Sequence, residues 1–132
     1  MTAVLADTSV WMRRQQPRVA RMLGNAIEGD RAVMTTPIAL ELLRSEPDLL
    51  TVGIRAGQID LLHWIPTTTT IEQRARDVLL VLARRGYHRG PSPVDLLAAA
   101  AAESVDAELW HCDRHFELIG EITGQPMRRV GT

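Results

Sequence analysis

Short apolar runs that end in polar residues alternate along this chain with longer segments of helical periodicity. Residues 3–6 form the first such run, which ends at Asp7, Thr8 and Ser9. Runs of this length, bounded by polar residues, are typical of buried strands in a parallel sheet. Further candidate strands lie at 32–34, 59–65, 108–112 and 127–130. The alternation predicts an α/β sandwich with a mainly parallel central sheet of four to five strands flanked by helices.

The segments between the candidate strands carry helix signals. Pro17 suits the first turn of a helix, and one apolar face is then shared by Val19, Met22, Leu23, Ala26 and Ile27. Thr36 is expected to cap the next helix, and Thr69 and Glu72 have the spacing of a capping box. We expect helices at 17–28, 37–44, 48–56, 71–85, 96–105 and 115–122.

Composition narrows the possible chemistry. A chain of 132 residues, 45% of them hydrophobic, fits one domain spanning 1–132, and a net charge of −1 gives no global basic field for nucleic acid. The sequence contains arginine but no lysine, so a P-loop lysine and a Schiff-base lysine are both excluded.

The single Cys112 can form no internal disulfide, and we expect an inert thiol in a buried strand. We expect a cytoplasmic protein with no targeting signal and no membrane span.

Three aspartates are predicted to meet at one edge of the sheet. Asp7 and Asp113 each follow an apolar strand, and parallel strands place their carboxyl ends at the same edge. Asp95 is near the start of a helix that should begin at that edge. Asp7 and Asp95 each have a second possible role. Asp7 either caps the next helix or is a ligand. Asp95 either completes a capping box with Ser92 or faces the cleft.

Glu41 is the fourth acid, and its immediate neighbours in the sequence are almost all apolar. A carboxylate buried among such residues needs a partner. A salt bridge to Arg44 or Arg74 would provide one. The other possibility is that Glu41 joins the aspartates.

Four converging carboxylates repel one another unless a cation neutralises them. All-oxygen ligation suits Mg²⁺ or Mn²⁺, and such a centre is what metal-assisted phosphodiester hydrolysis requires. Ala98 and Ala99, one turn beyond Asp95, are expected to leave the cleft open. Ser9 either orients a water or a carboxylate there, or caps a helix.

Four motifs in this order resemble those of PIN-domain ribonucleases, specifically the VapC-type toxins of toxin-antitoxin pairs. They are residues 5–11 (LADTSVW), 39–42 (ALEL), 89–99 (RGPSPVDLLAA) and 111–116 (HCDRHF). The resemblance covers essentially the whole chain. It implies a PIN-like three-layer sandwich and a Mg²⁺- or Mn²⁺-dependent endoribonuclease.

The resemblance also implies particular site residues and partners. The catalytic, metal-binding acids would be Asp7, Glu41, Asp95 and Asp113, with Ser9 as a supporting polar group. The partners would be an RNA substrate, a second copy in a homodimer, and a VapB-like antitoxin that blocks the cleft. Many relatives carry an aspartate where this chain has His115, so we expect at most one tightly held ion in the free protein.

Other side chains are assigned with their alternatives. Arg13, Arg14 and Arg89 either contact RNA phosphates or belong to solvated faces. His115 is a candidate proton donor, or a surface histidine.

The three tryptophans have different expected places. Trp64 and Trp110 alternate with apolar strand residues and are expected in the core. For Trp11, core packing is favoured over base stacking.

Two other functions remain compatible with the pattern. One is a non-catalytic RNA- or protein-binding PIN-like module. The other is a metal-dependent phosphatase for small substrates, which is disfavoured because nothing in the sequence indicates a closed specificity pocket.

Overall fold

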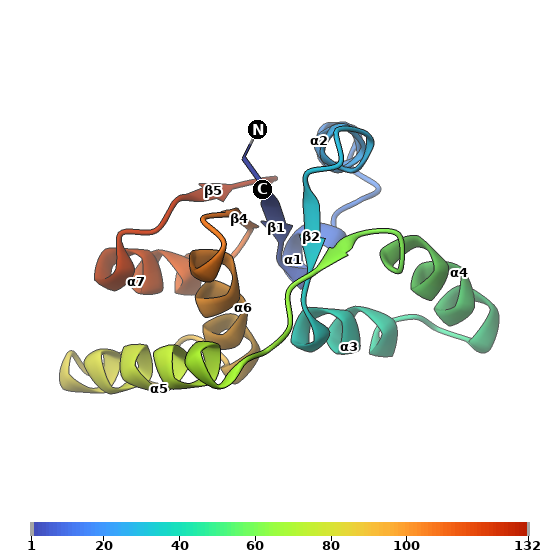
Figure 1. The fold of residues 1–132 in the computed structure, drawn as a ribbon. Coiled ribbons are helices and arrows are strands. Elements are labelled where there is room, and N and C mark those ends of the chain that lie inside the picture. The colour runs from blue at the N-terminus through green and yellow to red at the C-terminus, as the bar shows by residue number, and fades with distance from the viewer. Residues whose placement is uncertain (1, 132) are drawn as a thin grey trace.

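A five-stranded sheet forms the centre of the computed structural model, which describes residues 2–131. The strands are β1 (Val4–Ala6), β2 (Ala32–Met34), β3 (His63–Trp64), β4 (Glu108–His111) and β5 (Met127–Arg129). Their order is β3-β2-β1-β4-β5, and every neighbouring pair is parallel (Figure 1). The α/β sandwich predicted from the sequence is confirmed.

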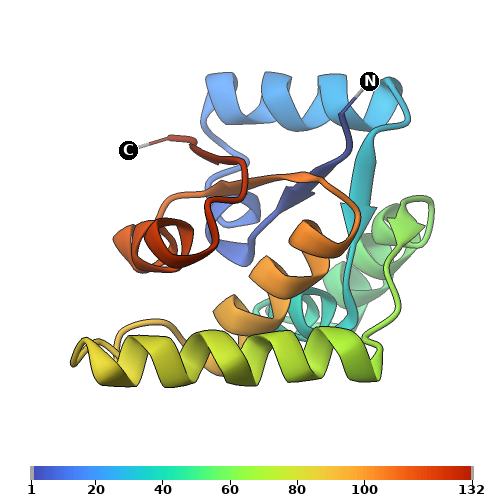
Figure 2. The ribbon, with the colours of Figure 1, turned by 60° about the vertical axis from the view of Figure 1, so that its left-hand side comes forward.

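Helices flank this sheet on both sides. They are α1 (Thr8–Trp11), α2 (Pro17–Glu28), α3 (Thr36–Arg44), α4 (Leu49–Ile59), α5 (Thr69–Arg84), α6 (Pro93–Ser104) and α7 (Arg114–Thr123). In Figure 1, α2, α3 and α4 lie to the right of β1, whereas α5, α6 and α7 lie to its left. Figure 2 shows α6 between the sheet and α5, which forms the outer layer on that side.

The register of the sheet decides which residues meet at its carboxyl edge. Leu5 is paired with Val33 on one side and with Leu109 on the other. The residues that follow β1, β2 and β4 therefore emerge at the same edge. α1, α3 and α7 begin just beyond those strands, so their N-terminal ends surround this edge as well.

The core extends on both sides of the sheet, and the part formed by α6 is rich in alanine. Residues 98–102 are all alanine, and at most 5% of each is exposed. Ala98 and Ala99 therefore do not keep a cleft open as expected from the sequence. Their small side chains instead allow α6 to approach β1 and β4 closely. In an open cleft, these alanines would be exposed to solvent.

Several boundaries differ from the sequence-based prediction. α4 continues through Gly57 to Ile59, and the strand expected over 59–65 is reduced to His63 and Trp64. Ile59 is the last residue of α4 and is buried, so this apolar residue belongs to the end of a helix and not to the start of a strand. The N-cap positions are Thr35 for α3 and Thr68 for α5, each one residue before the expected cap, and only the Thr68 side chain accepts a capping hydrogen bond.

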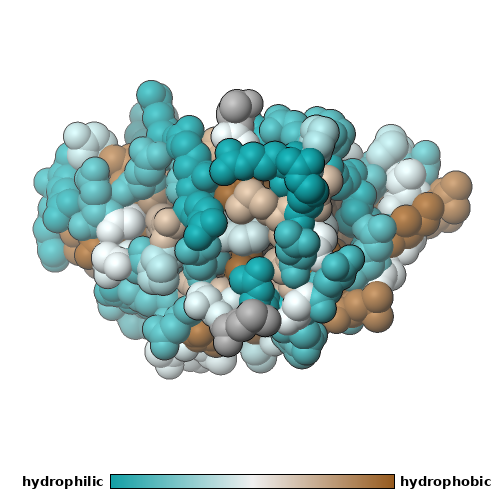
Figure 3. Space-filling view, turned by 90° about the horizontal axis from the view of Figure 1, so that it is seen from above, coloured by the Kyte–Doolittle hydropathy of each residue, from teal (hydrophilic) through white to brown (hydrophobic). Residues whose placement is uncertain are grey.

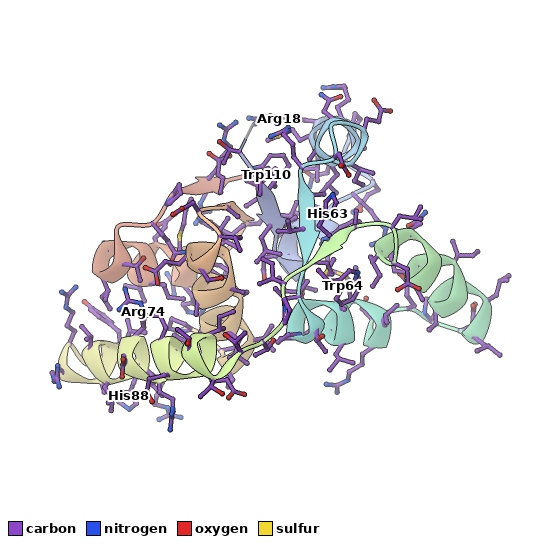
Figure 4. The ribbon with its side chains drawn as sticks, in the orientation of Figure 1. Arg18, His63, Trp64, Arg74, His88 and Trp110 are labelled. Atoms are coloured by element: carbon purple, nitrogen blue, oxygen red, sulfur yellow. The ribbon has the colours of Figure 1, made fainter. Side chains whose placement is uncertain are left out.

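Trp64 was expected in the core, and this prediction is wrong. The short β3 is an edge strand, and 40% of Trp64 is exposed. Its indole Nε1 donates a hydrogen bond to the Ile59 carbonyl, 3.1 Å away, which holds the ring beside β3 (Figure 4). Trp11 and Trp110 are buried, as predicted.

Apolar side chains are exposed at the end of the molecule that carries α4. Leu49, Leu50 and Ile54 of this helix and Leu61 just after it are more than half exposed. Figure 3 shows hydrophobic atoms gathered at this end. Among residues 2–131, no helix is long and apolar enough to cross a membrane.

Candidate metal centre

Asp7 is the most deeply buried acid at the carboxyl edge of the sheet, with 4% of its surface exposed. Its Oδ2 accepts hydrogen bonds from the backbone N–H of Ser9 at 3.0 Å and from the Ser9 hydroxyl at 2.7 Å. Its Oδ1 is buried and has no hydrogen-bond partner within the described part of the chain. Asp7 therefore does cap α1, but with one oxygen alone, and the other oxygen makes no hydrogen bond within the described residues.

Ser9 also connects β1 to β4. Its hydroxyl oxygen accepts a hydrogen bond from the backbone N–H of Cys112 at 3.1 Å while the same hydroxyl donates to Asp7. This hydroxyl thus fixes the Asp7 carboxylate relative to the end of β4. Cys112 lies one residue beyond the strand in which it was expected and is half-buried, with its thiol against the Val130 carbonyl.

Glu41 lies on the exposed face of α3, which corrects the expectation that it is buried. Its apolar neighbours Ile38, Ala39 and Leu42 turn toward the core, whereas Leu40 and Glu41 turn to solvent. The Thr8 hydroxyl donates a hydrogen bond of 2.7 Å to Glu41 Oε1, and Thr8 directly follows Asp7. Within residues 2–131, neither Arg44 nor Arg74 forms the salt bridge with Glu41 that the sequence suggested.

Arg74 is paired elsewhere. It points from α5 to α6, where its Nε lies 2.7 Å from Glu103 Oε1 (Figure 4). The carboxylate of Glu41 is thus bound by a hydroxyl and remains accessible from the solvent side.

Asp95 is placed by a capping box at the start of α6. Its Oδ2 accepts from the backbone N–H of Ser92 at 2.9 Å, and Ser92 Oγ accepts from the backbone N–H of Asp95 at 3.1 Å. This confirms the capping box predicted from the sequence. A carboxylate has two oxygens, so the cap orients Asp95 without preventing it from binding a cation.

Asp113 caps α7, and His115 lies in the first turn of that helix. Asp113 Oδ1 accepts a hydrogen bond of 2.9 Å from the backbone N–H of His115, and the imidazole Nδ1 is 3.4 Å from the same oxygen. Asp95, Asp113 and His115 each offer one ligand atom, and these atoms all lie within 4.8 Å of one another. The sequence suggested either a proton donor or a surface histidine at position 115, and did not indicate that it could join an ion-binding group. An aspartate N-cap followed two residues later by a histidine places both side chains at one helix end, which is a signal that the sequence contains.

The electrostatics show that the aspartates are close enough to interact. Burial raises the pKa of Asp95 to about 6, and the charges of Asp7 and Asp113 add to this increase. Burial also raises the pKa of Asp7, the Ser9 hydrogen bonds oppose this, and the charge of Glu41 raises it slightly further. The ionised cluster is therefore unfavourable without a cation.

The donor set fits a small divalent cation. Three half-buried ligand groups converge, and the partnerless Oδ1 of Asp7 is a buried negative oxygen beside them. Asp7 and Glu41 lie outside the three-residue group, but their charges act on its members or on each other. Carboxylate oxygens predominate, as Mg²⁺ and Mn²⁺ prefer.

Two hollows lie beside the acids. The first, of about 570 Å³, is lined by Thr36, Leu40, Glu41, Arg44 and Val94, among others. The second, of about 410 Å³, is lined by Tyr87, Arg89, Gly90, Arg114 and His115, among others. One hollow thus contains Glu41 and the other contains His115.

The three arginines singled out from the sequence have different surroundings. Arg89 is exposed and lines the hollow beside His115. Arg13 donates to the Ser9 carbonyl at 2.8 Å, so it supports the turn that carries Asp7. Arg14 is 3.3 Å from Glu46, which also binds Arg55 at 3.1 Å. Arg89 is the one of the three that faces a hollow next to the cluster.

His111 lies in a different environment from His115. It is buried against Phe116, with ring centroids 5.4 Å apart. Burial lowers its pKa, which favours the neutral imidazole. His111 therefore belongs to the core, and the spacing of four residues between the two histidines has no metal-binding meaning.

Comparison with known proteins finds relatives that are ribonucleases. It is 34% identical over 122 residues to "Ribonuclease VapC18" of Mycobacterium tuberculosis, covering 91% of this chain and 89% of that protein. It is 34% identical over 129 residues to "Ribonuclease VapC51" of the same species, covering 96% and 91%. No protein-family model matches the chain.

Solved structures share the fold at low sequence identity. The crystal structure of DNA-bound VapBC from Salmonella typhimurium superposes with a TM-score of 0.79 at 19% identity, covering 98% of each chain. VapBC2 from Rickettsia felis, bound to a DNA fragment from its promoter, gives a TM-score of 0.80 at 12% identity, covering 98% of this chain and all of that one.

Proposed function

Because the chain belongs to the VapC family of ribonucleases, we propose that it is a metal-dependent endoribonuclease and the toxin of a toxin-antitoxin pair. The observation that carries this proposal is the convergence of Asp7, Asp95 and Asp113, with the Oδ1 of Asp7 buried and lacking a partner in the described chain. Each of the four acids accepts at least one hydrogen bond, but a carboxylate that only stabilised the fold would not be expected to leave one buried oxygen without a partner, as Asp7 does.

We assign the cation, Mg²⁺ or Mn²⁺, to Asp95 and Asp113, with Asp7 beside them. A bound divalent ion lowers the pKa of a coordinated water and stabilises the negative charge that develops on the phosphate. The protein contributes the fixed geometry: Ser9 holds Asp7, and Ser92 holds Asp95. Glu41 is exposed and accepts a hydrogen bond from Thr8, and we assign it the role of accepting a proton from the attacking water.

The surroundings suit an extended, flexible substrate better than a small one. Both hollows are open and lie beside the acids, and each contains arginine: Arg44 in the first, Arg89 and Arg114 in the second. Arginines beside a cation centre can bind the flanking phosphates of single-stranded or looped RNA. This arrangement favours a polynucleotide over a small phosphate ester.

The proposal includes two protein partners. The solved relatives are described as VapBC complexes bound to DNA, and we expect this chain to bind a VapB-like antitoxin that blocks the cleft. We also expect a homodimer, and the exposed apolar side chains of α4 support the existence of a protein interface.

The test is cleavage of structured and single-stranded RNA by the purified chain with Mg²⁺ or Mn²⁺. We expect activity that EDTA abolishes and that Asp95→Asn lowers at least about a hundredfold, as for loss of a metal ligand in a hydrolytic site. Asp48→Asn, at the exposed cap of α4, is the matched control and should retain activity. Activity that persists in EDTA or in Asp95→Asn contradicts the proposal. RNA binding without cleavage by the wild type would favour the non-catalytic module.

A further inference from the structure

His115 occupies a constrained position next to two of the acids. Its backbone N–H binds Asp113 Oδ1, which places the residue in the first turn of α7, and its Nδ1 is 3.4 Å from the same oxygen. A Cβ added at Gly90 would lie 3.3 Å from His115 Cδ2, so the chain passes close to the imidazole ring there. Gly90 belongs to the loop that leads into α6 and Asp95. The ring therefore lies beside Asp113 at the start of its own helix and against the loop that leads to Asp95.

The spacing of these groups is close to that of a coordination shell. Ligand atoms of Asp95, Asp113 and His115 lie within 4.8 Å of one another. Two atoms at about 2.1 Å from one ion lie about 3 Å apart when they are adjacent in an octahedron and about 4.2 Å apart when they are opposite. Small side-chain rotations would bring all three onto one cation. The buried, partnerless Oδ1 of Asp7 is an independent sign that a positive ligand belongs here.

We propose that His115 is a nitrogen ligand of the cation and makes this centre selective for Mn²⁺ over Mg²⁺. The inference deepens the metal-dependent function proposed above and rests on it. Both ions bind carboxylate oxygens, but Mg²⁺ demands hard oxygen ligands in near-ideal octahedral geometry, whereas Mn²⁺ is a first-row transition ion that tolerates an imidazole nitrogen better than Mg²⁺ does. One nitrogen among carboxylates therefore favours Mn²⁺. From the sequence, His115 counted only as the loss of an aspartate that many relatives carry. In this proposal it is itself a ligand.

Pulsed electron paramagnetic resonance of the Mn²⁺-loaded protein tests the ligand directly. We expect ¹⁴N coupling from a coordinated imidazole in the wild type, retained in His88→Ala and lost in His115→Asp. His88 is an exposed loop residue, labelled below α5 in Figure 4, and serves as the matched histidine control. An absence of nitrogen coupling in the wild type, or coupling that survives in His115→Asp, overturns the proposal. In either case His115 would only form a surface ion pair with Asp113.

Calorimetric titration with Mn²⁺ and Mg²⁺ tests the selectivity. His115→Asp should reduce the ratio of Mn²⁺ to Mg²⁺ affinity at least about tenfold, since it exchanges the nitrogen for a hard oxygen. An unchanged ratio overturns the claim of selectivity. Circular dichroism confirms that the variants are folded, and if His115→Asp fails to fold, titration of the wild type decides: equal affinity for the two ions contradicts the proposal.

RNA cleavage by the same preparations separates this inference from the proposed function. Cleavage without nitrogen coupling leaves the ribonuclease proposal standing and removes His115 from the centre. Nitrogen coupling with no cleavage under any metal supports the Mn²⁺ site and contradicts the ribonuclease.

Discussion

The two oxygens of Asp7 have different environments, and this difference explains how one residue can cap a helix and serve a metal centre. Oδ2 receives both hydrogen bonds from Ser9, while Oδ1 is buried and finds no partner in the described chain. Burial raises the pKa of this carboxyl group, so holding it ionised destabilises the protein without a cation.

Asp7→Asn should therefore separate activity from stability. The amide oxygen can still accept from Ser9, and the buried negative charge disappears. We expect RNA cleavage to fall at least about a hundredfold. In EDTA at neutral pH, the melting temperature should equal or exceed that of the wild type.

Thermal denaturation and cleavage assays on one preparation check both parts. Asp48→Asn is again the control, because it removes an exposed cap carboxylate far from the centre. A large drop in the melting temperature of Asp7→Asn in EDTA would show that its carboxylate mainly supports the fold.

Arg89 and Arg18 are both exposed arginines, yet only Arg89 lines a hollow beside the acids. Arg18 lies on α2, at the top of the molecule in Figure 4, and lines neither of the two hollows beside the acids. Arg89→Ala should raise the apparent KM for RNA several-fold. It should also make the plot of log affinity against log salt concentration less steep, by about one or less in slope, as expected for the loss of one phosphate contact.

Arg18→Ala should change neither the affinity nor the salt slope. Fluorescence anisotropy with a labelled oligonucleotide, measured at several salt concentrations, distinguishes the two variants. Equal effects of the two substitutions would mean that RNA is held by diffuse charge and not at this hollow.

At the scale of elements, α6 links stability to the placement of an acid. The capping box between Ser92 and Asp95 satisfies backbone N–H groups at the start of the helix and fixes the Asp95 side chain at the same time. α4 has a capping box as well, formed by Asp48 and Thr51, but it lies far from the acids. The two caps provide a matched pair for experiment.

Ser92→Ala and Asp48→Ala should each lower the free energy of unfolding by about 1 kcal/mol, the usual effect of losing an N-cap. Only Ser92→Ala should also lower cleavage, by about tenfold, since Asp95 then loses its fixed orientation. Urea denaturation and initial rates measured below the transition give both quantities. If the two variants have equal activity, the cap has no role in positioning Asp95.

The elements also show what a sequence can predict about this fold. β1, β2 and β4 were predicted because each is a short buried run followed by a polar residue. β3 was not delimited correctly, because an apolar run containing the end of a helix and an edge strand looks the same as one long strand. The cap of α5 was misplaced within four consecutive threonines, where composition alone cannot select one position.

The candidate centre was predictable in part for similar reasons. Asp7 and Asp113 were placed together by the rule that parallel strands share a carboxyl edge. The environment of Glu41 was not predictable from its apolar neighbours, because adjacent residues in a helix point in directions about 100° apart. The proximity of His115 to Asp95 depends on how α6 and α7 pack, which no local pattern contains.

For the whole molecule, the centre should make stability depend on pH and on divalent cations together. The pKa of Asp95 is raised from 3.8 to about 6 in the folded state, so the folded protein binds more protons than the unfolded chain between these values. The stabilisation from this group is complete below pH 3.8 and is lost as the pH rises through about 6. A shift of this size corresponds to about 3 kcal/mol, and solvent screening of the half-buried carboxylate reduces it to about 1 to 2 kcal/mol.

A bound divalent cation should reverse this trend, since it binds the ionised carboxylates and is released when they are protonated. In EDTA, we expect the free energy of unfolding to decrease between pH 4.5 and 7.5 relative to Asp95→Asn, which lacks the titrating group. With millimolar Mn²⁺, the wild type should gain stability over the same range while Asp95→Asn gains much less. Urea denaturation at both pH values, with and without Mn²⁺, completes the test. Parallel pH curves for the two proteins in EDTA would mean that Asp95 is not destabilised by burial, and an equal gain from Mn²⁺ would mean that the cation binds elsewhere.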